Sequence, residues 1–278
     1  MLHRFLIQHV TAAVRRSKPV IGGVLERKLY ALQASNKLTN WVGSFLVGTA
    51  VVALALLTFL LANESSAAPQ ESKERLLETV LSASGDGIPW NQCERLESFA
   101  EDLRRILRGG PGKYQGNAVV CLGVLGDPRS KESLTVFLES GTGKVGEEEY
   151  LAKISVLWAL GAIANQSEDD SVREYLERGT NLTYWAQKVR WQGPSKIQPV
   201  DLQTQLARSS MQALGLAATP KALEYLNTFD CHGASPCPLN DVLHDARETC
   251  RQINELAKNA NILDRRKLLR EYFAADQQ

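Results

Sequence analysis

The chain of 278 residues has little of what catalytic, metal-binding and nucleic-acid-binding proteins need. It holds four histidines, two of them within the first ten residues, and no Ser–His–Asp, HExxH or GxSxG pattern. We therefore expect no catalytic residues and no cofactor. The formal net charge is +1, and because the first 40 residues are strongly basic the remainder is mildly acidic. Such a surface does not attract a phosphate backbone, so we expect no nucleic-acid partner.

Cysteine is also scarce, with five residues, too few for a domain built on disulfide bonds. Cys231 and Cys237 lie in a loop rich in Gly, Pro and Ser, and we predict a disulfide between them. Cys93 and Cys121 fall among apolar residues of expected helices, where free buried thiols are the simpler interpretation. Cys250 is the odd cysteine and an alternative partner for either loop cysteine. The Cys and His residues between positions 231 and 250 lack paired C-x-x-C spacing, so we expect no metal site.

One long apolar run, residues 41–62, stands out from the rest of the sequence, and no residue from 38 to 63 carries a charge. A bilayer core about 30 Å thick needs roughly 20 helical residues, which this run supplies. Residues 1–40 hold seven basic residues and a single acid, Glu26, and basic flanks stay on the cytoplasmic side. We therefore predict a single-pass protein of the inner membrane, with a cytoplasmic tail (1–40), a transmembrane anchor (41–62) and a periplasmic C-terminal part.

An alternative is that residues 41–62 form a long signal segment that is removed after export. Ser65, Ser66 and Ala67 provide the small-x-small pattern that signal peptidases use. Cleavage near Ala67 would release a periplasmic or secreted soluble adaptor. A signal peptide has an apolar core of about 7–15 residues, shorter than the run here, which favours a retained anchor. A polar linker, 63–75, follows in either case.

The remaining part, residues 76–275, contains an internal repeat of two helices. Three stretches resemble one another, NAVVCLGVLGDP, SVLWALGAIA and SMQALGLAATP, and each is followed by a second apolar helix with Phe or Tyr beside Leu. A turn with a small polar residue or Pro separates the two helices. Gly123 and Gly161 are 38 residues apart and Gly161 and Gly215 are 54 apart, so about 16 residues are inserted before the third copy.

This pattern resembles the HEAT-repeat family in its short bacterial-type, PBS-lyase-like form. The resemblance implies an all-α fold, a HEAT-like α-α solenoid of three to four repeats, here preceded by the predicted transmembrane helix. Gly or Ala on the first helix of a pair would let the second helix approach closely. The match covers about residues 90–230 and, by analogy, 240–275, where a last helix pair would cap the stack.

The resemblance also implies a function, that of a non-catalytic scaffold which binds another protein of the envelope or membrane. Some proteins of this repeat type attach bilins to antenna proteins as lyases, so a lyase-like enzyme is a second alternative. The predicted location outside the cytoplasm argues against that chemistry.

The insertion before the third copy holds the candidate contact residues. Insertions in solenoids emerge on one face, and aromatic residues beside Arg are typical of binding hot spots. The competing hypothesis is that its two tryptophans fill a gap between repeats. Trp158, in the second copy, is expected in the core. The candidate contact residues are Tyr184, Trp185, Lys188, Arg190 and Trp191.

Overall fold

The computed structural model describes residues 73–82, 88–109, 112, 114–194, 199–231 and 237–275. These residues are mostly helical, in agreement with the predicted all-α class. The predicted tail 1–40, the apolar run 41–62 and nearly all of the linker 63–75 lie outside the described residues. Among the helices that are described, none combines the length and apolarity needed to cross a membrane.

Twelve α-helices account for most of the described chain. They are α3 (Lys73–Ser82), α4 (Trp90–Glu94), α5 (Ala100–Arg108), α6 (Gln115–Leu125), α7 (Lys131–Glu139), α8 (Glu147–Ser167), α9 (Asp170–Gly179), α10 (Leu182–Lys188), α11 (Pro199–Ala217), α12 (Pro220–Thr228), α13 (Asn240–Asn259) and α14 (Arg265–Ala275). Two 3-10 turns, η1 (Glu97–Phe99) and η2 (Pro128–Ser130), precede α5 and α7. Two short strands, β1 (Gly143–Lys144) and β2 (Trp191–Gln192), pair in parallel.

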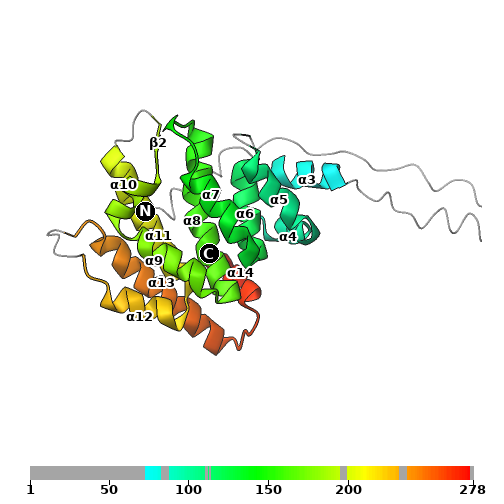
Figure 1. Cartoon of the computed structure of the whole chain (residues 1–278). Coiled ribbons are helices and arrows are strands. Elements are labelled where there is room, and N and C mark those ends of the chain that lie inside the picture. Colours follow the sequence, from blue (N-terminus) through cyan, green and yellow to red (C-terminus); the bar gives the residue numbers. More distant parts are fainter. Residues whose placement is uncertain are drawn as a thin grey trace, which may run out of the picture. The chain divides into compact units, whose positions relative to one another are not determined.

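The helices divide into two sets by their contacts (Figure 1). In the first set, α4, α6, α8, α11 and α13 each pack against the next helix of the set. The second set packs on the first, with α5 on α6, α7 on α8, α9 on α8 and α11, and α12 on α11 and α13. The three predicted helix pairs therefore correspond to α6–α7, α8–α9 and α11–α12, and neighbouring pairs share one apolar core.

A glycine in each of three first-set helices allows the close packing within that set. A Cβ atom on Gly123 would lie 2.8 Å from the Cα atom of Ala159 in α8. On Gly161 and on Gly215 it would lie 2.6 Å from a backbone carbonyl oxygen of α11 and α13, respectively. The prediction that these glycines bring together the two helices of one pair is wrong, because each glycine instead faces the first helix of the next pair.

The turns that follow the first-set helices share one geometry. The residue after each helix has a positive φ angle, of 67° at Gly126, 53° at Glu168 and 47° at Ala218. The next residue is extended, and its side-chain oxygen accepts a hydrogen bond from the first turn of the second helix. These residues are Asp127, Asp169 and Thr219. Because such caps satisfy free backbone N–H groups, they set where each second helix begins.

The last two helices differ from the predicted capping pair. Helix α13 packs on α11 as a further member of the first set, but α14 packs on α13 and α8. The Phe273 ring of α14 lies 6.2 Å from the ring of Trp90 and 6.1 Å from that of Trp158. Trp158 is half-buried, with its ring against Gly123 of α6 and near Phe273 of α14, so the expectation that it belongs to the repeat core holds only in part.

Two disulfides join residues of the described chain. Cys93 in α4 and Cys121 in α6 are bonded, with Cα atoms 4.8 Å apart, so the expectation of free thiols there is wrong. They meet because α4 packs on α6, a contact that their separation of 28 residues does not reveal. Cys231 and Cys237 are also bonded, with Cα atoms 5.7 Å apart. Cys250 is free and buried in α13.

Candidate functional site

The inserted segment before α11 folds as α10 and β2, and both of its tryptophans are buried. Trp185 has no exposed surface, and its Nε1–H donates to the carbonyl oxygen of Gly179 at 2.5 Å. Trp191 is 2% exposed, and its Nε1–H donates to the carbonyl oxygen of Leu138 at 2.6 Å. The hypothesis that these two residues contact a partner is wrong, because their rings are buried and their N–H groups donate to carbonyl oxygens inside the protein. They fill the space between helix pairs, as the competing hypothesis held.

Trp191 packs beside Lys153, a buried lysine of α8 whose ammonium group lies at the C-terminal end of α7. The Nζ atom of Lys153 lies 5.3 Å from the Trp191 ring centroid and donates to the carbonyl oxygens of Phe137, at 2.6 Å, and Ser140, at 2.9 Å. A cation at a helix C-terminus is favourable because the free carbonyls there are partially negative. Burial lowers the pKa of Lys153, and Glu149, 3.7 Å away, opposes this effect. This cluster fixes the insertion to the body of the protein.

Three of the five candidate residues still reach the surface. Tyr184 is half-buried and packs edge-to-face on Trp185, with ring centroids 5.1 Å apart. Lys188 is exposed and lies 3.6 Å from a carboxylate oxygen of Glu139. Arg190 is exposed in the turn between α10 and β2. The insertion therefore brings part of one aromatic ring and two cations to the surface.

Tyr184 also lines a groove of about 730 Å³ beside α10. Its walls come from the end of α9, from α10, from the end of α12 and from the segment that leads into α13, and they include Arg178, Thr180, Asn181, Tyr184, Tyr225, Phe229 and Leu239. The Tyr225 hydroxyl lies 2.6 Å from the Thr180 hydroxyl and donates to the carbonyl oxygen of Glu177 at 3.1 Å. Burial raises the pKa of both Tyr225 and Tyr184, so these phenols stay neutral at physiological pH.

The sequence pattern did not indicate this groove. Tyr225 belongs to the second helix of the third copy, where the repeat pattern assigns it to packing, and Phe229 follows that helix directly. Tyr225 and Phe229 line a groove because the end of α12 lies near the start of α10, which leaves one side of each ring facing the groove. A groove with aromatic walls, hydroxyl groups and an arginine at its rim can hold an extended or looped segment of another protein.

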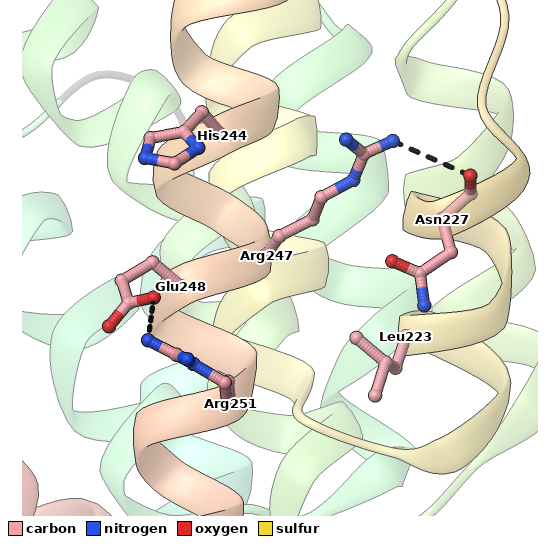
Figure 2. A pocket seen from close by; sticks show the side chains of 6 residues that line it. All are labelled: Leu223, Asn227, His244, Arg247, Glu248 and Arg251. Atoms are coloured by element: carbon pink, nitrogen blue, oxygen red, sulfur yellow. Dashed lines mark hydrogen bonds and ion pairs between the residues drawn. The ribbon is translucent and has the colours of Figure 1, made fainter.

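A second groove, of about 380 Å³, lies between α12 and α13 (Figure 2). The Arg247 guanidinium donates to the carbonyl oxygen of Leu226 at 2.9 and 2.7 Å, and Arg251 pairs with Glu248 at 2.5 Å. In α8 and α11, the glycine of each helix lies two residues after the alanine that the glycine of the preceding helix contacts. In α13 the contacted alanine is Ala246, and the residue two positions later is Glu248. A charged side chain thus replaces glycine in α13. This replacement disfavours the stacking of a further helix, so the groove marks the end of the stack.

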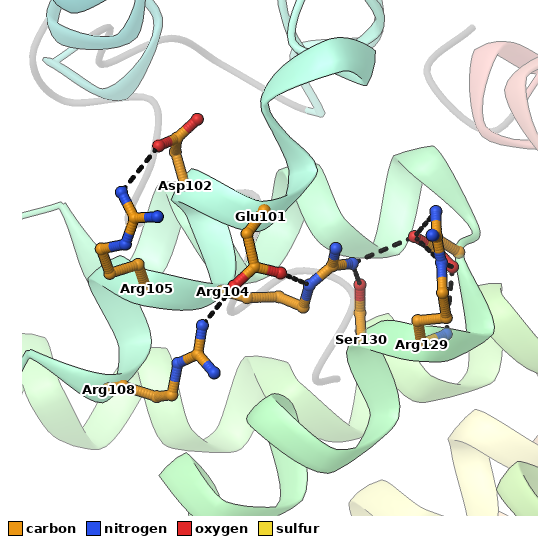
Figure 3. A network of polar contacts seen from close by, with 8 residues as sticks. Glu101, Asp102, Arg104, Arg105, Arg108, Arg129 and Ser130 are labelled. Carbon is orange, nitrogen blue, oxygen red and sulfur yellow. Dashed lines mark hydrogen bonds and ion pairs between the residues drawn. The ribbon is translucent and has the colours of Figure 1, made fainter.

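A third polar cluster joins α5 to the turn before α7 (Figure 3). The buried Arg104 donates to Glu101 at 2.9 Å, to Asp127 at 3.0 Å and to Ser130 at 3.2 Å. Burial favours the neutral form of Asp127, but hydrogen bonds from Arg129 and Arg104 outweigh it and lower the pKa of this carboxyl. Because the carboxylates already engage these arginines, the cluster serves as a structural link between two helix pairs and not as an anion site.

Among the described residues, no group of three or more His, Cys, Asp or Glu side chains is arranged to hold a metal ion. The groove beside α10, with its aromatic walls, hydroxyl groups and Arg178, is the candidate functional site. No protein-family model matches the chain, and neither a curated protein nor a solved structure shows significant similarity to it.

Proposed function

We propose that this protein is a HEAT-like α-solenoid, anchored in the inner membrane by residues 41–62, that acts as a non-catalytic scaffold and binds another envelope protein. The observation that carries the proposal is the regular contact of α6, α8, α11 and α13 through Gly123, Gly161 and Gly215. Repeated helix pairs that share one core are the packing of an α-solenoid, and solenoids present extended surfaces to other proteins.

The groove beside α10 supports the choice of surface. It brings the insertion next to the third helix pair, and it combines Tyr184, Tyr225 and Phe229 with the exposed Arg178. Aromatic residues and arginine are enriched at the centres of protein interfaces, where a concave site excludes water.

The N-terminal segment and the cysteines support the location. The basic tail 1–40 followed by the uncharged run 41–62 is typical of an anchor whose C-terminal side is exported. Disulfides such as Cys93–Cys121 and Cys231–Cys237 persist in oxidising compartments such as the periplasm. A periplasmic solenoid on a single anchor accounts for both features.

Site-specific photo-crosslinking in cells tests this proposal. A photoreactive amino acid at position 178 or 184 should yield the same discrete cross-linked product, since both residues line the groove. The matched control is position 105, because the Arg105 side chain is 70% exposed on α5 and lies outside the lining of the groove. Phe229→Ser should remove the product from positions 178 and 184. The proposal fails if position 105 gives the same product, or if the groove positions give none.

A further inference from the structure

Helix α14 covers a face built by helices far from it in the sequence. Leu268 and Leu269 have no exposed surface. Phe273 lies near the rings of Trp90 in α4 and Trp158 in α8. The face therefore offers apolar and aromatic side chains to one side of an amphipathic helix. We call this face, formed by α4, η1, the end of α6 and α8, the α14 seat.

The α14 seat and α14 have opposite charges where they meet. Three arginines of the helix each lie near a glutamate of the seat. The pairs are Arg265–Glu168 at 3.5 Å, Arg266–Glu97 at 3.3 Å and Arg270–Glu94 at 3.7 Å. Every member of these pairs is partly exposed, so salt screens the attraction between helix and seat.

One of these arginines, Arg266, also donates a hydrogen bond to a backbone carbonyl of the seat. Arg266 Nη2 donates to the carbonyl oxygen of Leu125, at the end of α6, at 2.8 Å, and its Nε lies 3.4 Å from Oε1 of Gln166. Free carbonyls at a helix C-terminus attract a cation. Arg270 Nη2 donates to Oδ1 of Asn91 at 2.7 Å. The seat therefore provides acceptors for two guanidinium groups one helical turn apart, those of Arg266 and Arg270, and buries the two leucines between them.

We propose that the α14 seat is a binding site for a basic amphipathic helix of a partner protein, and that α14 occupies this site as an internal competitor. The partner helix would carry Arg at positions i and i+4, Leu at i+2 and i+3, and an aromatic residue at i+7, as Arg266 to Phe273 do. This site is separate from the groove beside α10, and the proposal does not depend on what that groove binds.

The connection between α13 and α14 suits a helix that can leave its seat. Residues 260–264 link the two helices, Asn261 has a positive φ angle of 49°, and Leu263 is 89% exposed. Helix α14 is the last described element, so its release leaves the contacts among α6, α8, α11 and α13 intact. Terminal elements often open at lower free energy than the whole domain, because their opening exposes only their own contacts.

The probe for this site is a fluorescein-labelled synthetic peptide of residues 262–275, titrated against the full chain in mild detergent and followed by fluorescence anisotropy. The wild-type chain should bind the peptide weakly, because its own α14 competes at high effective concentration. Arg266→Glu/Arg270→Glu should loosen α14 and tighten peptide binding by about tenfold or more. The control, Arg105→Glu/Arg251→Glu, reverses two exposed arginines outside the seat and should bind as the wild type does.

A third variant ties the binding to the seat. In the loosened chain, Glu94→Gln/Glu97→Gln should remove most of the gain, because the two glutamates face the peptide's arginines and the neutral amides form no ion pair with α14. The proposal is overturned if the loosened chain binds the peptide no better than the wild type does, or if the seat substitutions leave the gain unchanged. A wild-type chain that is dimeric by light scattering and becomes monomeric with the peptide would also overturn it, because the seat would then serve a second copy of this chain.

Hydrogen exchange on the wild-type chain tests the same point without any substitution. Amides of α14 should exchange faster than those of α13, and raising NaCl should speed exchange in α14 while leaving α8 unchanged. Equal protection of α14 and α8 at low and high salt would show that α14 is a fixed part of the core, and would refute its role as a competitor.

Discussion

Gly161→Ala tests whether glycine is required for contact between successive helix pairs. In α8, the added Cβ would lie 2.6 Å from the carbonyl oxygen and 3.0 Å from the Cα atom of Ala213. Both neighbours are backbone atoms, so a change of rotamer cannot relieve the clash and α11 must move away. Overpacking of this kind costs about 3 kcal/mol, the upper part of its usual range. The higher helix propensity of Ala returns about 1 kcal/mol. The net loss is about 2 kcal/mol.

The assay is urea unfolding followed by circular dichroism at 222 nm, together with a thermal melt. For a domain of this size, a loss of about 2 kcal/mol lowers Tm by about 4–8 °C. Gly116→Ala in α6 is the matched control, since its Cβ would lie 4.0 Å from the nearest atom, the Cβ of Ala152, at ordinary contact distance. This control should be neutral or slightly stabilising. Equal stability of the two variants would refute the packing role assigned to Gly161.

Three further predictions concern the insertion, a charged pair and the anchor. Lys153→Met removes the ammonium donor from the carbonyl oxygens of Phe137, which keeps only the Ser140 hydroxyl, and of Ser140. It should cost about 1–3 kcal/mol in urea unfolding, while Lys188→Met at the exposed pair should change little. A hydrogen bond from Arg208 lowers the pKa of Asp241 from 3.8 to about 2. The pair's stabilisation is therefore complete above pH about 4 and is lost as the pH falls through about 2, and acid-unfolding curves of Asp241→Asn should lack this loss. Mass spectrometry of the membrane-extracted chain should find the N-terminal residues retained, whereas a chain starting at Ala68 would exclude the anchor.

The helical class and the repeat could be predicted because both depend on local pattern. Each pair of helices contains its own period of apolar residues. Each pair also contains a Leu–Gly step in the first helix and, after it, an Asp or Thr that caps the second helix. The helix that each glycine contacts could not be predicted, because Gly123 faces Ala159, a residue more than 30 positions away in the sequence. The same limit applies to the disulfide between Cys93 and Cys121, which exists only because α4 packs on α6.

The candidate site was the least predictable part for a physical reason. Trp185 and Trp191 lie in a segment whose composition is typical of binding hot spots. The sequence does not show that buried backbone carbonyls accept hydrogen bonds from their N–H groups. Tyr225 belongs to the repeat pattern and Phe229 follows its helix directly, and both line the groove because the start of α10 lies beside them. Helix α14 shows the apolar period of a capping helix, yet its arginines find their partners on α4, η1, α6 and α8.

We propose that the groove beside α10 binds another envelope protein, and the affinity of that complex is the most direct test. Once a protein cross-linked to position 184 is identified and purified, its Kd for the full chain can be compared with that for Phe229→Asp and for Val136→Asp. Val136 is 54% exposed on α7 and lies outside the lining of the groove. We expect Phe229→Asp to weaken binding at least about tenfold, as truncation of an interface hot spot does, and Val136→Asp to leave Kd unchanged. Equal affinities for all three chains would contradict the account.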